Sequence, residues 1–170
     1  VDQHRGFIEG APVFIKEVGW GISYNDASRL ASSGIMGIDV AGAGGTSWSQ
    51  VEMHRIDDPH RANVAKAFRG WGIPTALSIQ MVREAAPDLL LFASGGLRNG
   101  IDIAKSIALG AAMGGMASPF LKAAVISEEE TIQTILEIQR EIQISMFACG
   151  IPSLKDLQGI PTLLQKRGQA

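Results

Sequence analysis

The chain has one cysteine, no excess of positive charge and no long hydrophobic run. Cys149 has no partner for a disulfide within the chain or for a cysteine-rich metal site, so we predict that it is a buried packing residue. The formal net charge of -2, without basic clusters among aromatic residues, argues against nucleic acid as a partner. No apolar run approaches the roughly 18 residues that span a bilayer, and the first residues lack a signal-peptide pattern. We expect a cytoplasmic protein that binds neither nucleic acid nor membranes.

The composition, 46% hydrophobic and 19% charged over 170 residues, is typical of one globular domain covering residues 1–170. Short apolar runs alternate with segments long enough for crossover helices, which is typical of an α/β fold. The runs do not alternate strictly, as expected for parallel strands covered by helices. Five strands are predicted, at Pro12–Lys16, Met36–Ala41, Ile73–Leu77, Leu89–Ser94 and Ala112–Ala117. The predicted helices between them are Asn25–Ser33, Ser49–Gly70, Ser78–Ala86 and Asn99–Leu109.

A glycine-rich turn, Ser94–Gly100, joins the fourth predicted strand to the next helix. The first backbone N–H groups of a helix have no partner within the helix, and they carry the positive end of its dipole. Glycine also lets the backbone approach a ligand closely and adopt a positive φ. The turn therefore indicates a bound phosphate group, and the alternative is a tight connection without a ligand.

Repeated β/α units fit either an open doubly wound sheet or part of an eight-stranded barrel. A phosphate site built from the last two turns is typical of the barrel, and a second glycine turn, 114–118, follows one strand later. We therefore predict a (β/α)8 (TIM) barrel, of which this chain supplies about the last five β/α units. Polar residues lie at or just past the predicted strand ends, at Lys16, Asp39, Thr46, Ser94 and Arg98.

Two further segments carry local signals. Ser127-Glu128-Glu129-Glu130 is typical of a capping box, and the apolar stripe that follows predicts an amphipathic helix ending near Gly150 and packing on the domain. His54 and His60 lie in a polar helical stretch, where we expect an exposed helix face rather than a metal or catalytic site. Asp57-Asp58-Pro59 predicts a turn.

Several longer strings occur in a characteristic order: 14–23 (FIKEVGWGIS), 38–48 (IDVAGAGGTSW), 71–75 (WGIPT), the 94–100 turn, 104–111 and 115–122. Together, over about residues 13 to 160, they resemble the type 2 isopentenyl-diphosphate isomerases, flavin-dependent barrel enzymes of isoprenoid biosynthesis. The string GAGGTSW, at 42–48, is the most specific of them. The other glycine turns are shared more widely among flavin-binding barrels.

The resemblance implies FMN as cofactor and assigns residues to it. The ammonium of Lys16 is expected at the N1/O2 side of the flavin, where it stabilises the negative charge of the reduced ring; the alternative is a surface lysine. The hydroxyl of Thr46 is expected to contact the flavin. Ala41 stands where the family commonly has serine, so only its backbone could bind there. Backbone amides of two turns are expected to hold the flavin phosphate, at Gly96, Leu97, Arg98, Ala117 and Ser118.

Arg98 leaves two interpretations open, a bidentate contact to the phosphate or a side chain that points to solvent. The resemblance also implies the reaction, an interconversion of isopentenyl and dimethylallyl diphosphate by a 1,3-allylic proton shift. Reduced FMN takes part as acid and base, Mg²⁺ binds the diphosphate, NAD(P)H is the reductant, and the enzyme is expected to be a homo-oligomer.

In this family a Gln that assists proton transfer and a Glu that holds Mg²⁺ lie in a His-Leu-Asn-x-x-Gln-Glu segment, and residues 1–11 contain no such pattern. We therefore expect the chain to be the carboxyl-side portion of the enzyme, lacking the amino-side half of the barrel, with no residue of its own as metal ligand and no turnover by itself. One alternative is an FMN-dependent oxidoreductase of the 2-hydroxy-acid oxidase type, but its Ser-Asn-His-Gly-x-Arg-Gln string is missing. Another is a non-catalytic flavin-binding half-barrel.

Overall fold

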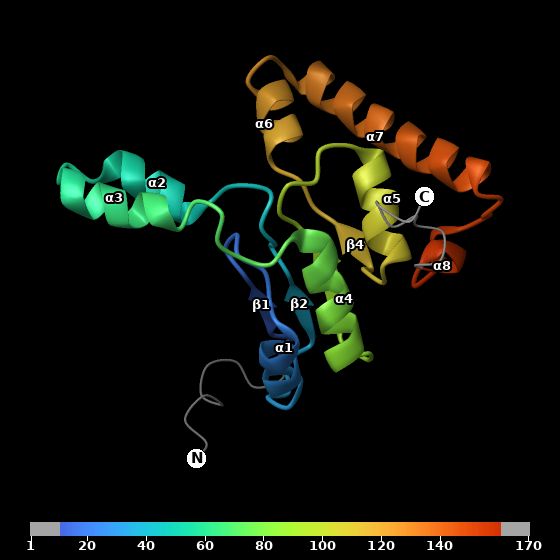
Figure 1. Ribbon diagram of the computed structural model, residues 1–170. Helices are drawn as coiled ribbons and strands as arrows, with labels where there is room; N and C mark the ends of the chain where they lie inside the picture. The colour runs from blue at the N-terminus through green and yellow to red at the C-terminus, as the bar shows by residue number, and fades with distance from the viewer. Residues whose placement is uncertain (1–10, 161–170) are drawn as a thin grey trace, which may run out of the picture.

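The computed structural model describes residues 11–160. Its centre is a parallel sheet of four strands that lie side by side in sequence order. The strands are β1 (Phe14–Lys16), β2 (Gly37–Asp39), β3 (Leu90–Ala93) and β4 (Met113–Gly114). Figure 1 labels β1, β2 and β4 of this sheet. Because all four run in the same direction, their carboxyl ends lie at one edge of the sheet, where β/α folds bind ligands.

Helices connect the strands. The helices are α1 (Tyr24–Ala31), α2 (Trp48–Arg55), α3 (Pro59–Ala67), α4 (Thr75–Ala85), α5 (Gly100–Ala108), α6 (Ser118–Ala124), α7 (Glu128–Ala148) and α8 (Leu154–Leu157). In Figure 1, α2 and α3 form a hairpin that projects away from the sheet, and α7 runs along α5 and α6. No helix among residues 11–160 is long and apolar enough to cross a membrane.

The main core lies between the sheet and helices α1 and α4. Ile38 and Val40 from the β2 segment and Leu91 from β3 are at most 1% exposed, and Ile79 and Val82 of α4 pack with them. Burying one such aliphatic side chain stabilises a fold by about 1.5–3 kcal/mol. This packing holds the register of the strands and therefore also the positions of the residues at their ends.

The predicted strand at 73–77 was wrong. Pro74 forms an isolated parallel bridge with Ala43, and helix α4 begins at Thr75, so the sheet has four strands within residues 11–160. Pro74 has φ -54, a value that suits the start of a helix, and proline has no N–H for a strand ladder.

The predicted helix at 49–70 is interrupted. It forms the two helices α2 and α3, and the chain leaves the helical conformation at Ile56. Asp58 begins α3, since its carboxylate accepts hydrogen bonds from the amides of His60 at 2.8 Å and Arg61 at 3.3 Å. The predicted turn at Asp57–Pro59 therefore lies at the connection between α2 and α3, and Pro59 is already the first residue of α3.

The amphipathic helix near the carboxyl end is confirmed as α7, and the Ser127 hydroxyl accepts a hydrogen bond from the amide of Glu130 at 3.1 Å. The prediction for Cys149 was wrong, because its side chain is exposed. Cys149 is the C-cap of α7, and Gly150 with φ +68 then turns the chain away from the helix axis. A side chain at such an end has no helix face to pack against.

Arg83 of α4 ties two connections together at the opposite end of the sheet. Its guanidinium donates hydrogen bonds to the carbonyls of Pro87 at 2.5 Å, Leu89 at 3.2 Å and Gly110 at 2.7 Å. Burial lowers the pKa of Arg83, and the charge of Asp88 partly opposes this effect. The contacts fix the points at which the chain enters β3 and β4.

Candidate functional site

A pocket of about 1180 Å³ lies at the carboxyl ends of the strands. It is lined by the segments that follow β1, β2, β3 and β4, and by the beginning of α6. All eight residues selected from the sequence line it: Lys16, Ala41, Thr46, Gly96, Leu97, Arg98, Ala117 and Ser118. The structure therefore brings together residues that lie up to 102 positions apart, since Lys16 and Ser118 border the same space.

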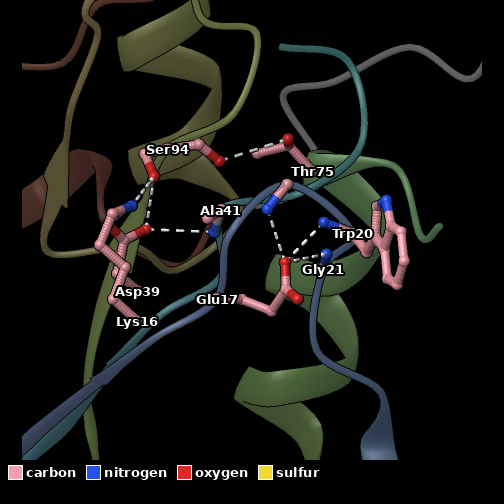
Figure 2. A network of polar contacts seen from close by, with 9 residues as sticks. Lys16, Glu17, Trp20, Gly21, Asp39, Ala41, Thr75 and Ser94 are labelled. Atoms are coloured by element: carbon pink, nitrogen blue, oxygen red, sulfur yellow. Dashed lines mark hydrogen bonds and ion pairs between the residues drawn. The ribbon is translucent and has the colours of Figure 1, made fainter. Parts of the chain in front are cut away.

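A cation, a carboxylate and a hydroxyl form a closed network at the edge of this pocket (Figure 2). Lys16 ends β1 and Asp39 ends β2, and the two are partners in the strand register. The Lys16 Nζ donates to Asp39 Oδ2 at 2.7 Å and to the Ser94 Oγ at 2.9 Å, and the Ser94 hydroxyl donates to Asp39 Oδ1 at 2.7 Å. The Lys16 side chain is 60% exposed and that of Asp39 is 18% exposed.

Ala41 follows β2 and has φ +34, which is unusual for a residue other than glycine. Its amide donates to Asp39 Oδ1 at 3.2 Å, and its carbonyl accepts from the amide of Gly21 at 3.4 Å. Ala41 is buried, and its amide is already engaged by protein. The sequence reasoning had left ligand binding by this backbone possible, but the structure uses the amide to hold the strained turn.

Glycines in two loops, 42–45 and 95–96, let the backbone of one loop pack directly against the backbone of the other. A Cβ on Gly45 would lie 2.6 Å from the amide nitrogen of Gly96, and a Cβ on Gly95, which has φ +99, would lie 2.6 Å from that of Gly42. The hydroxyl of Thr75 donates to the Gly95 carbonyl at 2.5 Å and holds this turn in place. Thr46 follows the first loop and is exposed toward the pocket.

Free backbone donors line the pocket in both glycine turns. The amides of Gly96, Leu97, Met116 and Ala117 donate no hydrogen bond to any group among residues 11–160. All four residues belong to the lining. Turn amides of this kind form anion-binding concavities.

The start of helix α5, by contrast, is occupied by the protein itself. Glu141 of α7 accepts a hydrogen bond from the amide of Gly100 at 2.5 Å, and the Asn99 side chain accepts from the amide of Asp102 at 2.9 Å. Within the predicted turn at 94–100, the free donors therefore lie before the helix start, at 96–97.

Arg98 is paired with Asp102. Its Nε donates to the Asp102 carboxylate at 3.1 Å and its amide at 3.2 Å, and its side chain is 80% exposed. Neither of these donors is free for a ligand. Lys122 of α6 also lines the pocket and forms no ion pair within the part of the chain that the structure describes. Sequence reasoning gave it no role, although it lies one turn after Ser118.

Glu17 shapes the loop after β1, and sequence reasoning missed it. One carboxylate oxygen accepts from three successive amides, those of Gly19 at 2.7 Å, Trp20 at 2.5 Å and Gly21 at 3.1 Å (Figure 2). The signal was a carboxylate two residues before a glycine at a strand end. This loop forms one wall of the pocket.

The histidines lie outside the site. His54 and His60 are exposed on the α2–α3 hairpin, as the sequence predicted, and the residues that line the pocket do not include them. Among residues 11–160, no three side chains of histidine, cysteine, aspartate or glutamate gather as potential metal ligands.

Comparison with known proteins shows the family to which the chain belongs. The family model of FMN-dependent dehydrogenases matches residues 7–163. The chain belongs to this family. Two relatives named isopentenyl-diphosphate delta-isomerase, from Synechocystis sp. and Xanthobacter autotrophicus, are each 48% identical, over 158 and 151 residues. The matches cover 93% and 89% of this chain but 45% and 44% of those proteins, so the chain spans less than half of their length.

Solved structures agree on the fold of this FMN-dependent dehydrogenase family member. A mandelate oxidase aligns with a TM-score of 0.64 at 20% identity, covering 88% of this chain and 37% of that one. A flavocytochrome b2 mutant with benzoylformate aligns with a TM-score of 0.62 at 21% identity, covering 88% and 34%. The predicted partial TIM barrel and the resemblance to the isomerases are confirmed, and the oxidase alternative is not favoured.

The pocket fits the cofactor after which the family is named. The free amides of the two glycine turns suit a phosphate group. Lys16 adds positive charge to the lining, within the network with Asp39 and Ser94. The lining therefore combines anion-binding amides with a cation, as a phosphate-bearing cofactor requires.

Proposed function

We propose that this chain provides the FMN-binding part of an isopentenyl-diphosphate delta-isomerase, which interconverts isopentenyl and dimethylallyl diphosphate by a 1,3-allylic proton shift. One observation carries the proposal. In a chain 48% identical to a relative of that name, all eight residues that the isomerase resemblance selects line a single pocket.

The residues divide into a phosphate end and a ring end. The amides of Gly96, Leu97 and Ala117, with Ser118, would hold the phosphate of FMN, and Lys122 would add positive charge. Lys16 would face the N1/O2 side of the ring and balance negative charge there. Bound in its reduced form, FMN supplies the acid and base of the proton shift.

Thr46 and Ala41 complete the ring end. The exposed hydroxyl of Thr46 would contact the flavin, and Ala41 would border it through its methyl group, because its amide is bonded to Asp39. Loss of the serine hydroxyl at this position removes one polar contact that the resemblance implies. The loop shaped by Glu17 would close the site on the β1 side.

The rest of the barrel would come from an amino-side half. Supporting this, the chain spans 45% of the length of its Synechocystis relative, and within residues 11–160 strands β1 and β4 each pair on one side only. That half would supply the Gln for proton transfer and the Glu that holds Mg²⁺ against the diphosphate. Residues 1–170 would then form one domain together with that amino-side half, and the chain by itself would be inactive. The whole enzyme would be a cytoplasmic homo-oligomer that uses NAD(P)H as its reductant.

The test combines FMN titration with an isomerisation assay in the full-length protein. We expect Lys16→Met to weaken FMN binding and suppress conversion of isopentenyl diphosphate. Lys155→Met is the matched control, because Lys155 is exposed on α8 and does not line the pocket. Failure of the unsubstituted protein to bind FMN would overturn the proposal. Binding of FMN without isomerisation would instead support the non-catalytic reading.

A further inference from the structure

We propose that Asp39 is a positioning residue that compensates the charge of Lys16, so that a bound flavin meets an ammonium–carboxylate pair rather than a lone cation. This inference rests on the proposed function. The Asp39 carboxylate lies 2.7 Å from the Lys16 ammonium, and strand register places the two residues side by side. The sequence pattern places Asp39 at a predicted strand end, and neither the pattern nor the resemblance assigns it a specific role.

Each oxygen of the carboxylate has separate partners. Oδ2 binds the ammonium of Lys16, and Oδ1 accepts from the Ser94 hydroxyl at 2.7 Å and from the Ala41 amide at 3.2 Å. Ser94 also accepts a hydrogen bond from Lys16, so the hydroxyl bridges the cation and the anion. The ammonium is therefore held from two directions at the pocket edge while its side chain stays 60% exposed.

Asp39→Asn isolates the charge. If the amide oxygen stays in the place of Oδ1, the contacts to Ser94 and Ala41 remain, and the new NH₂ group faces the Lys16 ammonium, donor against donor. The pair is then broken and the cation is uncompensated. A lone cation favours the reduced, anionic flavin over the oxidised, neutral one. Lys16→Met leaves the opposite charge behind and has the opposite effect.

The measurement is the ratio of the dissociation constants of oxidised and reduced FMN in the full-length protein, checked by the midpoint potential. We expect Asp39→Asn to change this ratio at least tenfold in favour of binding reduced FMN. We expect Lys16→Met to change it at least tenfold in favour of binding oxidised FMN. Tenfold corresponds to about 30 mV for a two-electron couple. The double variant Lys16→Met/Asp39→Asn restores a neutral site and stays within threefold of the unsubstituted protein.

Two further variants separate charge from structure. Asp39→Glu keeps the carboxylate and is expected to stay within threefold of the unsubstituted ratio, which also tests the inference should the Asn variant fail to fold. Asp57→Asn, at an exposed carboxylate of the α2–α3 turn, is the matched control and leaves the ratio unchanged.

The outcomes distinguish the two proposals. A ratio unchanged by Asp39→Asn, a double variant that equals Lys16→Met, or an Asp39→Glu shift as large as that expected for Asp39→Asn overturns the role of Asp39 while leaving FMN binding intact. If the unsubstituted protein binds no FMN, the proposed function falls, and this inference falls with it.

Discussion

Substituting Gly95 with alanine tests whether the two glycine loops must pack backbone on backbone to build the pocket. Gly95 has φ +99, and an added Cβ would lie 2.6 Å from the Gly42 nitrogen and 2.9 Å from the Ala41 carbonyl carbon. Neighbouring backbone can relieve such contacts only if one loop moves. The turn that carries the free amides of Gly96 and Leu97 would therefore shift away from its place.

Two terms set the size of the effect. An L-residue forced to a positive φ costs about 1–2 kcal/mol, and overpacking costs about 1–3 kcal/mol. Gly95→Ala is therefore expected to lower the free energy of unfolding by about 2–5 kcal/mol. FMN affinity should fall as well, because the amides at 96 and 97 no longer point to the same place.

The assay is urea unfolding of the full-length protein together with FMN titration. Gly70→Ala is the control, because Gly70 has no positive φ and an added Cβ would meet nothing within 4 Å. We expect that variant to remain within about 0.5 kcal/mol of the unsubstituted protein. A loss below about 1 kcal/mol in Gly95→Ala, with unchanged FMN affinity, would refute the reasoning.

Three further predictions concern stability. Ser78 is fully buried and its hydroxyl both donates to and accepts from the backbone of Ile22 at 2.8 Å, so Ser78→Ala should cost about 2–3 kcal/mol in urea unfolding, with Ser78→Thr less harmful. Arg83→Met leaves three carbonyls without their donor and should lower the unfolding midpoint, whereas Arg83→Lys restores part of it. A hydrogen bond from its own backbone and one from Ser127 lower the pKa of the exposed Glu129. The stabilisation from the ionised Glu129 carboxylate is therefore present above the unfolded-state pKa and is lost as the pH falls through the folded-state pKa. Ser127→Ala should reduce this change of the free energy of unfolding with pH over that acidic range.

A strand could be predicted from an apolar run where the neighbouring residues also favoured a strand. The runs at 12–16, 36–41 and 89–94 each contain an observed strand, and in the second and third runs Ile38, Val40 and Leu91 are buried in the core. The run at 73–77 is equally apolar, yet Pro74 starts a helix there. Short apolar segments do not separate strand from buried helix by periodicity, and only proline's fixed φ argued for the helix.

The lining of the pocket could be predicted because its residues lie in contiguous strings that a family resemblance carries. The contacts among them could not, since they join distant positions. Glu141 reaches Gly100 across 41 residues, and no local pattern predicts that the start of α5 is filled. The pairing of Arg98 with Asp102 could have been predicted from the sequence, because residues at i and i+4 are neighbours around a helix start.

The pairing of Lys16 with Asp39 depends on strand register, and hydrophobic packing on the other face of the sheet sets that register. Ile38 and Val40, on either side of Asp39, are fully buried against the helices, so their side chains point away from that of Asp39. A slip of one residue would bring Asp39 into the core and set an aliphatic side chain beside the ammonium. Burial of two aliphatic residues therefore positions the carboxylate next to the cation, and the charge of the pocket is determined by the core beneath it.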